Sequence, residues 1–84
     1  MATLPSELKT KWQRDPDTLV RLIARLKDDP TAHLDQVKSK GFTVRHTYSL
    51  MAALALEGKA SAALALAKES WVLSIEEDKP VRAM

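Results

Sequence analysis

The sequence predicts an α+β fold in which four strands form an antiparallel sheet and two helices cover one of its faces. Residues 42–50 and 71–78 alternate apolar and polar side chains, as strands do, whereas residues 30–41 and 60–67 carry apolar side chains at helical spacing. The chain has 84 residues, the size of one small domain. We expect its free energy of unfolding to be about 4 to 12 kcal/mol.

Residues 1–17 are expected to form an N-terminal extension that precedes a domain of residues 18–84. Leu4, Leu8 and Trp12 are the apolar anchors of this extension, and they share one face of a short helix expected from about Ser6 to Arg14. The Asp15-Pro16 pair would end that helix. A frayed terminus with one docked tryptophan is an equal alternative.

The central segments divide at glycine and proline. Residues 18–27 fit both the helix and the strand template, so periodicity leaves them open. Asp29 before Pro30 predicts a helix that begins at Pro30 and ends at Gly41. Residues 42–50 form the next strand, Gly58 separates a strand from an alanine-rich helix, and residues 71–78 form the last strand.

With the first segment as a strand, the element order is βαββαβ, the ferredoxin-like sandwich, followed by an extended C-terminal tail. Both helices then lie on one face of the four-stranded sheet, and the other face is open. The expected core consists of the following residues: Val20, Leu22, Leu26, Leu34, Val37, Val44, Tyr48, Leu54, Leu56, Leu64, Leu73 and Ile75.

Composition and motifs argue against several classes of function. The chain has no cysteine, and its two histidines, His33 on an expected exposed helix face and His46 on a strand, have no spaced carboxylate cluster beside them. No phosphate-binding glycine loop is present either, so we expect no metal, no cofactor and no enzymatic activity. A net charge of +2 favours neither a nucleic acid nor a membrane surface as partner.

Two further expectations concern binding and location. An RNA-recognition module has the same layout, but it needs aromatic side chains at the centre of the open face, and this chain has four aromatic residues in all. The chain as written has no export signal, so a cytoplasmic location is expected, with secretion by another route or within a precursor left open.

The segment from Val72 to Met84, VLSIEEDKPVRAM, resembles the end of the propeptide of subtilisin-like serine proteases. In that family an apolar strand runs into an acidic E-x-D or E-E-D, then a short extended stretch, and then a small and an apolar residue at the cleavage position. The resemblance extends upstream through Lys40-Gly41-Phe42-Thr43-Val44, Tyr48-Ser49-Leu50, Leu54-Ala55-Leu56 and Leu19-Val20-Arg21-Leu22. It covers residues 18–84 and implies a strand for the first segment.

The resemblance implies an inhibitor of subtilisin-like serine proteases. Residues 79–84 would lie extended in the substrate cleft like a cleaved product, with Pro80, Val81, Arg82, Ala83 and Met84 as the cleft-binding residues. The chain stops where the protease would cut, which favours a free-standing inhibitor that is monomeric when free. The alternative is a propeptide that acts as a folding chaperone for a separate protease.

In the family the open sheet face also packs on two surface helices of the protease. Period-two alternation places Glu76 and Asp78 on one side of the last strand, opposite Leu73 and Ile75, where their carboxylates would cap the helix N-termini. Glu77 would point the other way. The small outward residues that would let those helices approach closely are Ser49, Ala53, Ala55 and Ser74.

Overall fold

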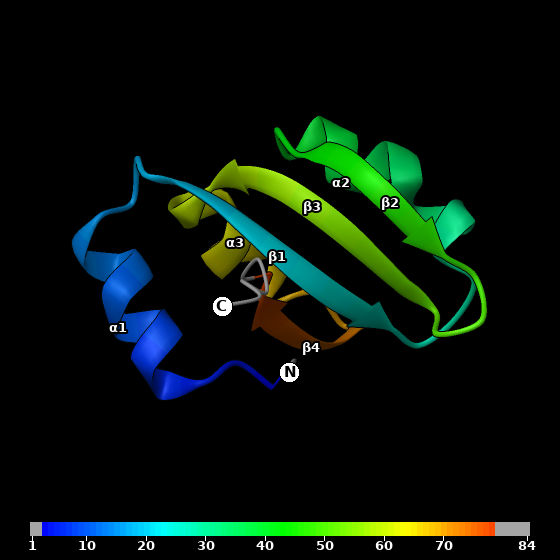
Figure 1. The fold of residues 1–84 in the computed structure, drawn as a ribbon, viewed down its shortest axis with the longest axis horizontal. Helices are drawn as coiled ribbons and strands as arrows, with labels where there is room; N and C mark the ends of the chain where they lie inside the picture. Colours follow the sequence, from blue (N-terminus) through cyan, green and yellow to red (C-terminus); the bar gives the residue numbers. More distant parts are fainter. Residues whose placement is uncertain (1–2, 79–84) are drawn as a thin grey trace, which may run out of the picture.

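Four strands form one antiparallel sheet in the computed structural model of the chain, which describes residues 3–78 (Figure 1). The strands are β1 (Leu19–Leu26), β2 (Thr43–Tyr48), β3 (Ala53–Lys59) and β4 (Val72–Glu77), in the order β2-β3-β1-β4 across the sheet. The helices are α1 (Ser6–Arg14), the 3-10 turn η1 (Pro30–His33), α2 (Leu34–Ser39) and α3 (Ala60–Leu66). The predicted ferredoxin-like fold is thereby confirmed, and the ambiguous first segment is a strand.

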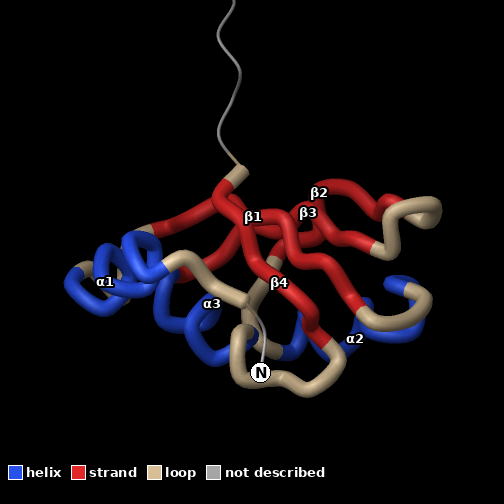
Figure 2. The backbone as a smooth tube through the Cα atoms, turned by 90° about the horizontal axis from the view of Figure 1, so that it is seen from below, coloured by secondary structure: helices blue, strands red, loops and turns tan. Residues whose placement is uncertain are grey.

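The helices gather on one side of the sheet and leave the other side uncovered (Figure 2). α2 and α3 lie behind the sheet in Figure 1 and below it in Figure 2, and α1 lies beside α3 near the end where β1 begins. Strand β3 leads directly into α3, because Gly58 belongs to the strand and Ala60 starts the helix. None of the helices within residues 3–78 has the length and apolar character needed to cross a membrane.

The core lies between the sheet and the helices. Leu22, Leu54, Leu56, Val37 and Ile75 are fully buried, as expected from their positions on the inward face of each element. Alternation along the two central strands produces this layer, because every second residue of β1 and β3 faces the helices. The larger buried side chains outside the expected core list are Trp12, Phe42, Leu66 and Val72.

The segment after β1 differs from the single helix expected over residues 30–41. Its start agrees with the prediction, because the Asp29 carboxylate accepts a hydrogen bond from the Thr31 backbone N–H at 3.0 Å, and Pro30 is the first helical residue. The helix changes type at His33, whose φ of −112° leaves the α region, so a 3-10 turn precedes the six-residue α2. Gly41 follows with a φ of 95°, the positive value that a residue without a side chain adopts easily.

Two β-bulges place two of the expected core residues on the surface. In β4 the register with β1 shifts between Arg25 and Leu26, so Val72 and Ile75 both face the helices while Leu73 is 48% exposed. In β2 the register shifts at Arg45, which turns Tyr48 outward and leaves it 39% exposed. The assignment of Leu73 and Tyr48 to the core was wrong, because strict alternation fails across an inserted residue.

The N-terminal helix occupies the range expected from the sequence, Ser6–Arg14. Trp12 is 1% exposed and belongs to the same buried cluster as the strands, with Leu4 and Leu8 packed against that cluster. Before the helix, Thr3 forms a parallel bridge with Ser74 on β4. Residues 3–14 and the domain that follows therefore share one hydrophobic core.

Candidate protein-binding face

The open face of the sheet carries five of the six described residues that were predicted to contact a protease. Strand pairing sets its layout, because residues paired across neighbouring strands project from the same face. Ala55 pairs with His46 on β2 and with Ile23 on β1, and Ile23 pairs in turn with Glu76 on β4. This row of four crosses the sheet from edge to edge. The adjacent row toward the β2–β3 turn contains Tyr48, Ala53, Arg25 and Ser74.

Glu76 and Asp78 project from this open face, whereas Glu77 projects toward the helices. The ion pair that Glu77 Oε1 makes with Lys11 Nζ of α1, at 3.5 Å, fixes the direction of Glu77. Asp78 follows the last strand residue, and its backbone N–H donates to the Arg21 carbonyl at 2.9 Å, which extends the β1–β4 pairing by one position. The carboxylates of Glu76 and Asp78 therefore stand on one face at the end of an edge strand.

Asp78 has a positively charged ion-pair partner, and Glu76 has none within residues 3–78. Asp78 Oδ2 lies 3.5 Å from Arg45 Nη1, the bulge residue of β2. Glu76 is exposed and forms no ion pair or hydrogen bond with residues 3–78. Glu76 is therefore the more available acceptor, and Arg45 is a neighbour of the site that the sequence pattern did not indicate, because the bulge decides where its side chain points.

The small residues of the open face are less accessible than expected. Ala53 and Ala55 are 0% and 1% exposed, although no helix within residues 3–78 covers this side of the sheet. Larger side chains on both neighbouring strands flank them, including Tyr48 and Ile23. Ser74 is half-buried, and Ser49 lies in the turn after β2 instead of on the strand. A partner helix would therefore contact the larger side chains that flank the alanines, and the alanines would lie beneath those side chains.

The remaining predicted contact residues form the tail. Pro80, Val81, Arg82, Ala83 and Met84 lie outside the described residues, as does Lys79. The described chain ends at Asp78, one residue after β4, at the edge of the open face.

Aromatic side chains do not form a stacking platform at the centre of this face. Among residues 3–78 the rings that pairing places on it are His46 and Tyr48, both on the edge strand β2, with centroids 5.9 Å apart. The outward positions of the central strands carry alanine, isoleucine, arginine, glutamate, lysine and leucine. The geometry needed to stack bases across a sheet is therefore absent from the described part of the chain.

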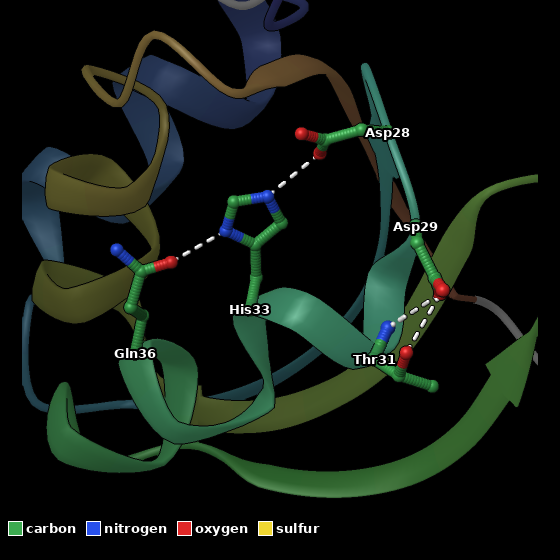
Figure 3. A network of polar contacts seen from close by, with 5 residues as sticks. All are labelled: Asp28, Asp29, Thr31, His33 and Gln36. Atoms are coloured by element: carbon green, nitrogen blue, oxygen red, sulfur yellow. Dashed lines mark hydrogen bonds and ion pairs between the residues drawn. The ribbon is translucent and has the colours of Figure 1, made fainter.

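His33 forms a polar cluster on the helix side of the molecule (Figure 3). Its Nε2 lies 2.7 Å from the Asp28 carboxylate, its Nδ1 donates to the Gln36 side-chain oxygen, and its ring stacks on Trp71 at 4.3 Å. The prediction of an exposed helix position was wrong, because only 13% of the side chain is exposed. Both ring nitrogens face acceptors, and a ring that donates from both is the imidazolium cation.

The hydrogen bond to Gln36 and the bond and charge of Asp28 raise the pKa of His33 above its ordinary value of 6.5, against partial burial, which lowers it. Within residues 3–78, no serine, threonine, cysteine or lysine side chain forms a hydrogen bond with this histidine. In the same part of the chain, no three His, Cys, Asp or Glu side chains are grouped closely enough to hold a metal ion. Through these contacts His33, at the end of η1, joins Asp28, Gln36 of α2 and Trp71 of the segment before β4.

Comparison with models of known protein families gave no match, and a search of curated proteins also gave none.

Proposed function

We propose that this chain inhibits subtilisin-like serine proteases by docking the β4 end of its open sheet face on the enzyme and placing residues 79–84 in the substrate cleft. The observation that carries the proposal is the shared direction of Glu76 and Asp78 on a face that no helix covers. Carboxylates so placed can accept hydrogen bonds from the free N–H groups at helix N-termini and meet the positive end of the helix dipole.

The order of the segments supports a two-part contact. The strand that carries the carboxylates is the one that leads into the tail, so docking of the face would deliver the tail to the cleft beside it. An extended tail adds main-chain hydrogen bonds of the β-strand type, and Pro80 restricts its conformations before binding. Met84 and Val81 would then occupy apolar subsites, Ala83 a narrow one, and Arg82 would face solvent.

An activity titration of a subtilisin tests this proposal. Full-length chain should inhibit at micromolar concentration or below, and a variant lacking Val81 to Met84 should lose most of the inhibition, because the cleft contact is removed. Unchanged protease activity at micromolar full-length chain would contradict the proposal for that enzyme class.

The double variant Glu76→Ala with Asp78→Ala isolates the contact made by the face. Loss of two helix-capping carboxylates should weaken inhibition about 5- to 30-fold, from roughly 1 to 2 kcal/mol in total. Glu7→Ala with Asp35→Ala is the matched control, because it removes the same charge from exposed positions on α1 and α2. Equal weakening by both double variants would show that net charge alone, and no docked carboxylate, is responsible.

The chaperone alternative predicts a different time course. An inhibitor should stay intact during prolonged incubation with the protease, whereas a propeptide should be degraded after assisting refolding of the denatured enzyme. Mass spectrometry of the mixture distinguishes the two.

A further inference from the structure

Residues 3–14 contact strand β4 near both ends of that strand. At the start of the strand, the Thr3 N–H donates to the Leu73 carbonyl at 2.8 Å, and the Thr3 carbonyl accepts from the Ile75 N–H at 2.9 Å. At the other end, Lys11 Nζ pairs with Glu77 Oε1 at 3.5 Å. We call residues 3–14 the strap.

The strap is fixed to the rest of the protein through its middle. Trp12 is 1% exposed within the main buried cluster, and α1 packs against α3. Leu4 and Leu8 line the same side of the segment and are partly buried against that cluster. The contacts to β4 are therefore made by a segment that the core itself holds in place.

Strand β4 is the element that most needs such support. It is an edge strand, so among the strands it pairs with β1 alone, and a bulge interrupts this pairing between Arg25 and Leu26. An edge strand leaves a row of backbone N–H and C=O groups without partners in the sheet. Thr3 satisfies two of those groups, one on each side of Ser74, next to the bulge.

We infer that the strap is a positioning element that holds β4 in register and so fixes Glu76 and Asp78 in the geometry needed for docking. This inference rests on the proposed function. Binding weakens when a contact surface must first be ordered, because the ordering entropy is lost on association. A chain whose β4 is held before it meets the protease avoids that loss, and the strap supplies this hold from within the chain.

Thr3→Pro tests the inference with little change to the rest of the molecule, because proline removes the N–H that donates to Leu73 and leaves the side-chain position exposed. Thr3→Ala is the matched control, since it keeps both backbone hydrogen bonds. Hydrogen exchange on the free chain should show the Ile75 amide exchanging about tenfold faster in Thr3→Pro, relative to amides of the central β1–β3 pair, and unchanged in Thr3→Ala.

Inhibition of subtilisin is the second readout. Thr3→Pro should weaken inhibition at least threefold while Thr3→Ala inhibits as the wild type does. Unchanged exchange at Ile75 would overturn the inference, and so would faster exchange with undiminished inhibition, which would reduce the strap to a stabilising contact. If the wild-type chain does not inhibit, the proposed function fails, and the exchange result alone decides whether the strap holds β4.

Discussion

The two edge strands of the sheet are held in very different ways. On β4, Val72 and Ile75 are buried, and Thr3 forms a β-bridge along the backbone edge that faces away from β1. On β2, no residue is fully buried, and within residues 3–78 the strand pairs with β3 alone. The turn that joins β2 to β3 exposes Leu50 completely. The edge that carries the candidate docking carboxylates is therefore the one that the core and the N-terminal segment support.

The largest expected effect on the free energy of unfolding is at Trp12, in the N-terminal segment that supports β4. Trp12→Ala should lower the free energy of unfolding by about 3 to 5 kcal/mol, because it leaves a large cavity in the core. That loss is a large part of the roughly 4 to 12 kcal/mol available to a chain of this length. Urea unfolding followed by circular dichroism measures it.

Two companion variants sharpen the comparison. Trp12→Phe should cost less than its change in size suggests, because the buried Trp12 Nε1–H has no hydrogen-bond partner among residues 3–78 and phenylalanine removes that group. Leu50→Ser, in the turn beside β2, should change the free energy of unfolding by less than about 0.5 kcal/mol. A Leu50→Ser effect as large as that of Trp12→Ala would contradict the contrast between the edges.

A smaller effect is expected where the segment before β2 contacts β3. A Cβ atom added at Gly58 would lie 2.6 Å from Cδ1 of Phe42, which is itself buried. Gly58→Ala should therefore lower the free energy of unfolding by about 1 to 3 kcal/mol. Adding Phe42→Leu to the same chain should recover part of that loss, and strictly additive losses in a double-mutant cycle would exclude the predicted clash.

The smallest effect concerns pH and the segment that leads into β4. Because the pKa of His33 is raised in the folded chain, its stabilising contribution is complete below the ordinary value of 6.5 and is lost as the pH rises through the raised pKa. The free energy of unfolding should therefore fall as the pH rises from about 6.5 through the raised pKa of His33. His33→Phe, which retains a ring to stack on Trp71, should flatten this dependence.

The topology could be predicted from the sequence because each element carries a local signal. Pro30 starts a helical segment, Gly41 ends it, and apolar residues alternate along the strands. The first strand was the exception, because residues 18–27 fit two templates and only the family resemblance favoured a strand.

Other features depend on contacts between distant residues and leave no local signal. The bulges that expose Leu73 and Tyr48 arise where neighbouring strands fall out of register, which one strand's pattern does not reveal. The stacking of His33 on Trp71 joins residues far apart in the chain, and so does the bridge from Thr3 to Ser74. The alternation of Glu76, Glu77 and Asp78 was predictable because it lies beyond the bulge.

The charges at one end of the open face have a consequence for the speed of association. Arg45 lies on β2, Glu57 on β3 and Arg21 on β1, and Asp78 directly follows β4, so their signs alternate across the sheet. Two ion pairs, Arg21 with Glu57 and Arg45 with Asp78, join them. Such a row is electrically neutral and produces little field beyond a Debye length. These two ion pairs should therefore contribute little electrostatic steering to the encounter with a partner, and their contribution to the association rate should be almost independent of ionic strength.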